Sequence, residues 1–256
     1  IWCTSIYKNP QYDFSGKDFY NSSLIVKYRI FISSLTAKIC DVLILKTMDV
    51  EEFVDFYSID EDKVIPMSNP IVLYDKSLKN PTRKKLALFF FGKLSESKGA
   101  NKLPKISDML NNSGIEHLII IAGSGPLKSK LVHKNIRHLG HVNEVNKVIN
   151  FSDIIILPYT KEHCCGHAQV ESMALGKAVI IKATKSQQNW FEHRKNIFFT
   201  FDESEESYYK AVKELYENPN LISRIEKNSR LVIEKEWNMN KFCDDFIEYC
   251  LYNKPF

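Results

Sequence analysis

Short, strongly apolar segments alternate with more polar, helix-like segments along the central part of the chain. Five of the apolar segments, each six or seven residues long, are rich in aliphatic and aromatic residues: LALFFFG (86–92), HLIIIAG (117–123), DIIILPY (153–159), KAVIIKA (177–183) and NIFFTF (196–201). Segments this apolar predict strands buried on both faces. The intervening residues 102–114, 142–152 and 167–176 have helical spacing. Strands alternating with helices predict an α/β fold with a parallel sheet, whose ligands bind at the carboxyl ends of the strands.

The two ends of the chain have patterns of their own. From Glu203 onward the sequence has helical spacing and no strand pattern, which predicts packing helices. Near the N-terminus, residues 22–39 and 50–58 have helical spacing and flank one apolar run at 41–47, which is too little for a complete sheet domain. The polar segment 74–85 lacks periodicity and predicts a linker.

We therefore expect three parts. Residues 1–79 form a partial N-terminal portion with the linker, residues 80–240 form the larger α/β domain, and residues 241–256 form a helix that packs back on the N-terminal portion. The chain starts at Ile1, and its first residues, IWCTSIY, have the pattern of a strand already under way. We expect the chain to begin inside a larger protein.

Composition restricts the class of protein. The 256 residues are 44% hydrophobic and 26% charged, which is typical of a globular chain. The net charge of +4 is small, and the basic residues are scattered, so nucleic acid is not an expected partner. Six cysteines without regular spacing favour a reducing, cytoplasmic setting over a disulfide scaffold. No apolar run approaches the roughly 20 residues that cross a bilayer.

The end of the first predicted strand of the larger domain carries a candidate phosphate site. In FFFGKLSESKG, Gly92 would let backbone approach a ligand closely, and Lys93 and Lys98 would converge on a phosphate or diphosphate. Two solvated lysines are the alternative, since Lys and Arg are frequent throughout the chain. The next strand ends in AGSGP, which lacks the third glycine of a dinucleotide fingerprint and favours a tight turn into a helix.

The stretch KEHCCGH raises the question of a metal site. His163, Cys164, Cys165 and His167 are all residue types that bind zinc. Only the spacing from His163 to His167 suits a zinc ligand pair, and adjacent cysteines do not. We therefore expect no metal here and interpret the cysteines as packing residues.

Taken in order, GKLSESKG, IIAGSGP, IRHLGHV, FSDIIILPY and GHAQVESMALGKAVI resemble the donor-binding domain of retaining glycosyltransferases of family 4. The resemblance covers about residues 80–240 and extends to the segment before the linker. It implies the two-domain GT-B fold, with a Rossmann-like donor domain and an incomplete N-terminal acceptor-side portion. It also implies sugar transfer from a nucleotide diphosphate sugar with retention of configuration and without an obligatory metal or other cofactor.

The resemblance assigns roles to individual residues. Gly92 matches the glycine whose backbone contacts the diphosphate, and Lys93 and Lys98 match the basic residues that neutralise it. Glu171 matches the second acid of the family's E-x7-E motif, which accepts hydrogen bonds from the ribose. Gly166 and His167 match positions that face the donor sugar and phosphate. His141 and Val142 match positions that line the nucleobase pocket.

The E-x7-E motif is altered in this chain. Eight residues before Glu171 stands His163, and the nearest acid, Glu162, is one residue too early. Either a shifted loop brings Glu162 to the donor sugar, or His163 takes that place with different hydrogen-bonding groups. Glu171 has a second interpretation, because an acid in the first turn of a helix is favoured by the helix dipole alone.

We expect an enzyme whose partners are a nucleotide diphosphate sugar and an acceptor sugar or lipid-linked glycan. The basic, aromatic segment VKYRIF leaves peripheral membrane contact open, although an amphipathic packing helix explains it as well. Two alternatives remain. The altered motif and the short N-terminal portion suit a non-catalytic module that binds a nucleotide sugar or a partner, and a GT-B sugar-nucleotide epimerase would need no acceptor.

Overall fold

A computed structural model of the protein describes residues 32, 34–40, 43–45, 54–55, 57–66, 70–71, 73, 85–160 and 166–252. The chain divides into two compact units, one made of residues 70–241 and the other of residues 1–69 together with 242–256. We describe each unit by itself.

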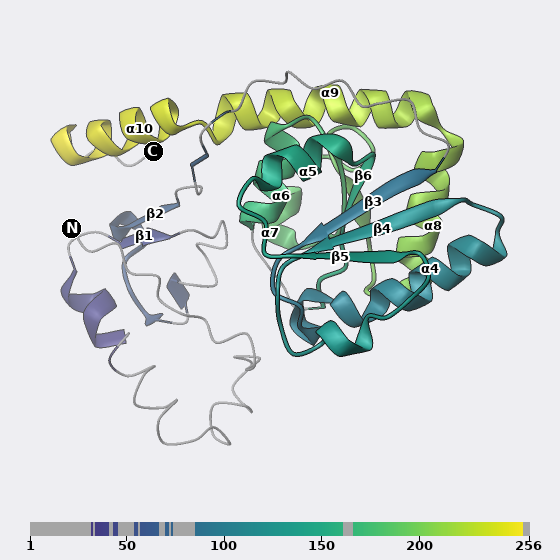
Figure 1. Ribbon diagram of the computed structural model, residues 1–256. Helices are drawn as coiled ribbons and strands as arrows, with labels where there is room; N and C mark the ends of the chain where they lie inside the picture. Colours follow the sequence, from purple (N-terminus) through teal and green to yellow (C-terminus); the bar gives the residue numbers. More distant parts are fainter. Residues whose placement is uncertain are drawn as a thin grey trace. The chain divides into compact units, whose positions relative to one another are not determined.

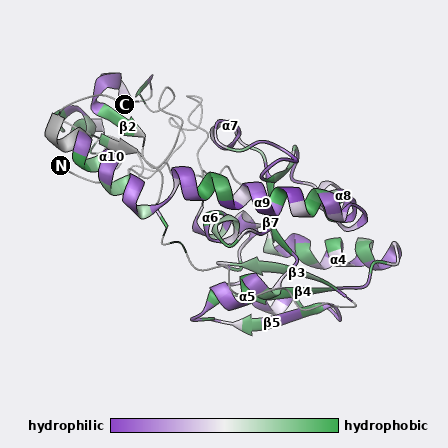
Figure 2. Cartoon of the chain, turned by 90° about the horizontal axis from the view of Figure 1, so that it is seen from above, coloured by the Kyte–Doolittle hydropathy of each residue, from purple (hydrophilic) through white to green (hydrophobic). Residues whose placement is uncertain are grey.

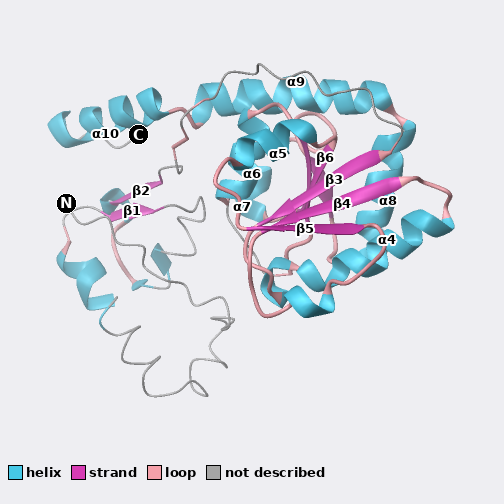
Figure 3. Cartoon of the chain, in the orientation of Figure 1, coloured by secondary structure: helices cyan, strands magenta, loops and turns pink. Residues whose placement is uncertain are grey.

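The larger unit is built on one parallel sheet of six strands, shown in Figures 1 and 3. Its strands are β3 (Leu86–Phe91), β4 (His117–Ala122), β5 (Ile136–Gly140), β6 (Ile154–Leu157), β7 (Ala178–Lys182) and β8 (Phe198–Thr200). They lie side by side in the order β5-β4-β3-β6-β7-β8, and every pair is parallel. The strand order therefore reverses direction between β3 and β6, which in doubly wound sheets is where ligands bind.

Helices cover both faces of this sheet. They are α4 (Leu103–Asn112), α5 (Val145–Phe151), α6 (His167–Ala174), α7 (Lys185–Gln188), α8 (Glu205–Glu217) and α9 (Pro219–Glu236). One layer contains α4 packed against α8, and the other contains α5 packed against β3 and α6 (Figure 1). The predicted α/β fold, a parallel sheet flanked by helices, is confirmed.

The core lies between these layers. All residues of β3 and β6 are buried, and Phe89 and Phe90 are fully inaccessible to solvent. Each buried side chain of this size contributes about 1.5 to 3 kcal/mol through the hydrophobic effect. In Figure 2, α4 and α9 alternate between hydrophobic and hydrophilic colours, as helices that bury one face do.

Strand β5 was not among the strands predicted from sequence. It lies at the edge of the sheet, and its residues alternate between half-buried and exposed, so IRHLG lacks the continuous apolar run that marks the other strands. The connection from β4 to β5 contains the single 3-10 turn η4 (Lys128–Lys130), where a tight turn into a helix was expected. The expectation of a turn was right, but the helix is only one turn long.

The smaller unit contains the parallel pair β1 (Leu43–Leu45) and β2 (Val64–Pro66), with the 3-10 turn η1 (Glu61–Lys63) before β2. Ala37, Leu43, Tyr57 and Val64 form its small cluster of buried apolar residues.

The final helix and the linker bear on the predicted domain boundaries. Helix α10 runs over Met239–Tyr252, and most of the linker predicted at 74–85 falls outside the described residues. The boundaries drawn from sequence stay predictions. Among the described residues, no helix has the length and apolar character needed to cross a membrane.

Candidate functional site

Three glycines mark the carboxyl ends of neighbouring strands in the larger unit. Gly92, Gly123 and Gly140 end β3, β4 and β5, and their φ angles are +135°, +130° and +71°. The Gly92 amide donates to the carbonyl oxygen of Ala122 at 3.0 Å, and the Gly123 amide donates to that of Gly140 at 2.7 Å. A β-carbon added to Gly92 would meet no atom within 4 Å, so the Gly92 backbone faces open space where a ligand could approach.

Leu94, in the loop after β3, forms hydrogen bonds with the turn after β4. The Leu94 amide donates to the Ser124 carbonyl oxygen at 2.9 Å, and the Leu94 carbonyl oxygen accepts from the Leu127 amide at 3.1 Å. A β-carbon on Gly125 would lie 2.4 Å from that same carbonyl oxygen. The second glycine of AGSGP therefore allows two loops to pack together, which is a structural reason for the motif.

The loop after β3 also packs against the loop after β6 and forms hydrogen bonds with it. The 3-10 turn η2 (Glu96–Lys98) ends at Gly99, whose φ is +66° and whose added β-carbon would collide with the Pro158 carbonyl oxygen. The Thr160 amide donates to the Ser97 carbonyl oxygen at 3.3 Å, and its hydroxyl donates to that of Glu96 at 3.1 Å. These contacts join β3 to β6, at the reversal of the strand order.

Lys98 occupies this junction. Its Nζ lies 4.2 Å from the centroid of the Tyr159 ring, within the range of a cation–π contact. Lys98 is half-buried, whereas Lys93 is exposed to solvent. A third lysine, Lys102, is buried, and its ammonium donates to the Glu203 carbonyl oxygen and lies 3.8 Å from the Glu203 carboxylate. Lys102 is therefore paired with an acid of its own chain, and Lys98 contacts the face of the Tyr159 ring.

Helix α6 begins at the same edge of the sheet, after β6. Gly166 is its N-cap and has an extended conformation, and the Gly166 carbonyl oxygen accepts from the amides of Gln169 and Val170 at 3.0 and 3.1 Å. The first amides of a helix have no acceptor within the helix, and the positive end of its dipole favours an anion there. The segment beginning at Gly166 is therefore suited to hold a phosphate or sugar oxygen.

Glu171 is the fifth residue of α6, and His167 is the first. Burial raises the pKa of the Glu171 carboxyl group, and the nearby His167 opposes this shift by a smaller amount. Because Glu171 lies beyond the first turn, the interpretation that the helix dipole alone favours an acid there was wrong. A half-buried acid whose charged form is disfavoured needs another reason to be present, and a ligand hydroxyl is one.

Comparison with known proteins identifies the family. Residues 74–232, more than half of the chain, match the family described as Glycosyl transferases group 1. The chain belongs to the group 1 glycosyl transferases. A search of curated protein sequences gives no match.

Three solved structures share the fold of this group 1 glycosyl transferase. Anabaena HepE in complex with UDP and glucose has a TM-score of 0.74 at 14% identity, over 88% of this chain and 67% of HepE. A variant of S. aureus TarM in complex with fondaparinux, α-GlcNAc-glycerol and UDP has a TM-score of 0.72 at 14% identity, over 86% and 46%. The pneumococcal O-GlcNAc transferase GtfA, in complex with UDP and GlcNAc, has a TM-score of 0.67 at 18% identity, over 81% and 44%.

The structure brings several of the predicted site residues of the transferase to one edge of the sheet. Gly92, Lys93 and Lys98 follow β3, while Gly166 begins the helix after β6. His141 and Val142 follow β5 at the same edge, where His141 is exposed and Val142 packs partly against the core. Their assignment to a nucleobase pocket stays a prediction.

Two candidate sugar contacts lie outside the described residues. Glu162 and His163, with Cys164 and Cys165, fall in the segment 161–165, so the question of the altered E-x7-E motif stays open.

Sequence reasoning missed Tyr159 and Thr160, which contact the turn that carries Lys98. The apolar context of DIIILPY marked Tyr159 as part of a strand, and nothing in the sequence linked it to Lys98.

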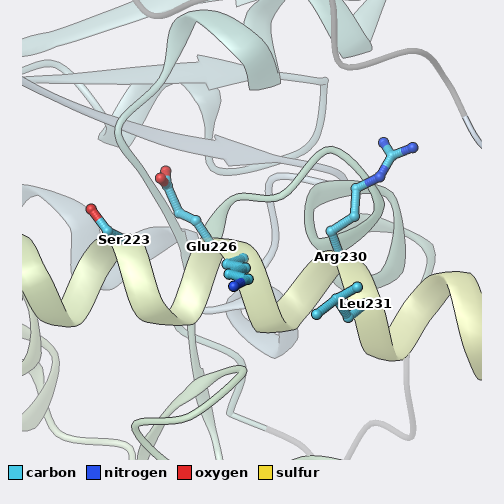
Figure 4. A pocket seen from close by; sticks show the side chains of 5 residues that line it. Ser223, Glu226, Arg230 and Leu231 are labelled. Atoms are coloured by element: carbon cyan, nitrogen blue, oxygen red, sulfur yellow. The ribbon is translucent and has the colours of Figure 1, made fainter.

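A pocket on the transferase surface lies elsewhere, on α9. It is lined by Ser223, Glu226, Lys227, Arg230 and Leu231, and Figure 4 shows the labelled members of this set on a single helix. None of these residues follows a strand of the sheet, and none was predicted to contact a donor. The candidate site therefore rests on the strand ends and their glycines.

Proposed function

We propose that this group 1 glycosyl transferase binds a nucleotide diphosphate sugar at the carboxyl ends of β3 and β6. We further propose that the whole protein transfers the sugar to a glycan or lipid-linked acceptor, with retention of configuration as in family 4. The observation that carries the proposal is the junction at the strand-order reversal, where the turn that carries Lys98 contacts the loop after β6 and the Gly92 backbone at the end of β3 faces open space.

Each residue type suits the part of the donor assigned to it. Lys93 and Lys98 would place two positive charges on the diphosphate, and the Gly92 backbone would allow its close approach. Glu171 would accept hydrogen bonds from the ribose hydroxyls, as an ionised carboxylate can. The amides at the start of α6, next to Gly166 and His167, would face the donor sugar and phosphate.

The two lysines would act by electrostatic stabilisation. As the bond between the sugar and the diphosphate breaks, negative charge builds on the departing nucleotide diphosphate, and the two lysines would stabilise it more in the transition state than in the ground state. Retention would follow from attack on the face that the diphosphate leaves, with a donor phosphate oxygen taking the acceptor proton. Glu171 would be committed to the ribose, so no dedicated protein nucleophile is assigned.

The comparisons support this proposal without fixing the donor. HepE, TarM and GtfA share the fold and were each solved with UDP, which makes a uridine nucleotide the first ligand to try. The chain spans between 44% and 67% of these proteins, so the acceptor and its linkage are proposals about the whole protein. We also propose a cytoplasmic setting, which the pattern of cysteines favours.

A non-catalytic nucleotide-sugar-binding module is the second candidate. The observation that favours it is the one-residue offset between Glu162 and the position expected for the first acid of the motif. Such a module would bind the nucleotide through the same lysines but would not cleave the donor. Proton NMR of the protein with a bound nucleotide sugar separates the two, because a retaining enzyme slowly releases the sugar first as the anomer present in the donor.

Calorimetric titration with UDP, GDP and ADP, in the presence of EDTA, tests the donor site. We expect one nucleotide to bind, and Lys98→Ala to weaken its binding by about tenfold or more, since a hydrogen bond between charged groups contributes roughly 1.5 to 3 kcal/mol. Glu171→Ala should weaken binding through the ribose.

Lys134→Ala and Glu116→Ala are matched controls, because both side chains are exposed near the opposite, amino ends of the strands. They should bind like the wild type. Binding of no nucleotide, or equal binding by Lys98→Ala and the wild type, would refute the proposed site.

A further inference from the structure

Tyr159 and Lys98 form a contact that links the two halves of the sheet. Tyr159 follows β6 and is 4% exposed, and the Lys98 ammonium lies 4.2 Å from the centroid of its ring. We propose that Tyr159 is a positioning residue that holds the Lys98 ammonium in place for the donor diphosphate. This proposal rests on the proposed function, because it assumes that Lys98 binds the nucleotide.

The backbone fixes both partners before any side chain is considered. The turn that carries Lys98 ends at Gly99, which packs so closely on Pro158 that no β-carbon fits between them. Directly after Tyr159 in the sequence, Thr160 donates two hydrogen bonds to the same turn, to the carbonyl oxygens of Ser97 and Glu96. The residues before and after Tyr159 therefore both contact the turn that carries Lys98, which places the base of the lysine side chain beside the ring.

A ring differs from an acid as a partner for a binding lysine. Lys102 shows the other arrangement, because its buried ammonium is paired with Glu203, which compensates its charge. The face of the Tyr159 ring attracts the Lys98 ammonium through the quadrupole of the ring and carries no net charge.

Holding the ammonium in advance should raise affinity. A lysine side chain has many rotamers, and a ligand that must immobilise it loses binding free energy to this ordering. On the Tyr159 ring, part of that ordering is already present in the protein without ligand. Because the contact is buried on the ring side, its strength should lie toward the upper part of the range measured for such pairs.

The nucleotide affinity of Tyr159 variants tests whether Tyr159 positions Lys98. Tyr159→Leu should bind the nucleotide diphosphate that the wild type selects from UDP, GDP and ADP about five- to thirtyfold more weakly. Tyr159→Phe keeps the ring and should bind within about twofold of the wild type. In a Lys98→Ala background, Tyr159→Leu should cause no further loss, because the two changes remove the same interaction.

Tyr208 provides a matched control. Like Tyr159 it is a buried tyrosine, and its hydroxyl donates to the Leu157 carbonyl oxygen at 3.3 Å. Tyr208→Leu should lower stability as Tyr159→Leu does, yet leave nucleotide affinity near that of the wild type. Equal losses of affinity in the two variants would show that general loosening, and not the position of Lys98, is responsible.

An NMR measurement without nucleotide tests the contact itself. The ε-methylene protons of Lys98 should resonate upfield in the wild type and in Tyr159→Phe, because they lie over an aromatic face. Ordinary chemical shifts for these protons in the wild type would overturn the proposal even if Tyr159→Leu does not fold.

The outcomes separate the two proposals. A wild type that shows the upfield shift but binds no nucleotide would refute the donor site, and with it the role of the contact in binding. A wild type that binds nucleotide while Tyr159→Leu binds equally well would leave the donor site standing and refute the positioning role alone.

Discussion

The backbone of Gly123 lies so close to that of Gly92 that a β-carbon on Gly123 would be 2.0 Å from the Gly92 carbonyl oxygen. Gly123 also has a φ of +130°, which side chains of L-amino acids rarely allow. We predict that Gly123→Ala lowers the free energy of unfolding by about 2 to 4 kcal/mol, through overlap and backbone strain. Urea unfolding followed by circular dichroism measures this change, and a loss below about 1 kcal/mol would contradict the close packing of the two strand ends.

Gly92 offers the opposite case, since an added β-carbon would meet open space. We predict that Gly92→Ala folds, with a cost in backbone strain of about 1 to 3 kcal/mol, but binds nucleotide much more weakly because the methyl group occupies the path of the diphosphate. Gly114→Ala is the control, because Gly114 also has a positive φ, +72°, and open space, but precedes β4 at its amino end. Unchanged nucleotide affinity in Gly92→Ala would place the diphosphate elsewhere.

In the absence of ligand, the buried Glu171 carboxylate should lower the free energy of unfolding. Burial raises its pKa, so the folded state binds the proton more tightly than the unfolded state, and stability falls as the pH rises from the unfolded pKa, about 4.3, through the raised value. We predict that Glu171→Gln is more stable than the wild type at pH 7.5 and that this difference shrinks toward pH 4. The same variant should bind nucleotide more weakly.

Thermal unfolding of Glu171→Gln across this pH range, alongside the calorimetric titration, checks both effects. Lower stability of the variant at pH 7.5 would show that Glu171 serves the fold and not the ligand.

Buried hydrogen bonds around His117, at the amino ends of the strands, should contribute to the free energy of unfolding. Ser107 lies on α4 and is fully buried, and its Oγ is 2.7 Å from Nε2 of His117 on β4. The His117 Nδ1 lies 2.8 Å from the Ile115 carbonyl oxygen and must donate to it, so Nε2 accepts from the Ser107 hydroxyl. We predict that Ser107→Ala costs about 1 to 3 kcal/mol, because the buried Nε2 then keeps only the longer contact, 3.4 Å, with the Asn135 amide nitrogen.

The same network predicts a dependence on pH. Burial lowers the pKa of His117, so the unfolded state binds more protons, and stability should fall as the pH drops below the unfolded value of about 6.5. His117→Gln should flatten this fall between pH 7.5 and 5.5 in urea unfolding. Burial also lowers the pKa of His193, so His193→Gln should remove a separate part of the slope. A slope unchanged by His117→Gln would contradict a neutral, buried His117.

The strands of the sheet could be predicted from sequence where burial is complete. β3 and β6 are inaccessible on both faces, and their sequences show it as unbroken apolar runs. β5 could not be found in this way, because an edge strand with exposed Arg137 and Leu139 has no such run. β8 is also an edge strand, but it is buried and was predicted, so the exposed side chains of β5 and not its edge position alone hid it.

The candidate site could be predicted only as far as it depends on residues close in sequence. Gly92, Lys93 and Lys98 share one loop, and their spacing suggested a phosphate site. The contact of Lys98 with Tyr159 joins two loops that meet only because the sheet places β3 beside β6. His117 on β4 likewise finds its partner Ser107 on a different element, α4, and the sequence does not link the two.

The most direct test of the donor site is a nitrogen–proton NMR titration of the labelled chain with the nucleotide that binds in calorimetry. Glycine amides are suited to this, because Gly92, Gly99, Gly123 and Gly166 lie at the carboxyl edge of the sheet while Gly114 lies at the amino edge. We predict large, saturable shifts for the first four amides and none for Gly114. Shifts confined to the amino edge, or to the pocket on α9, would contradict a donor site at the ends of β3 and β6.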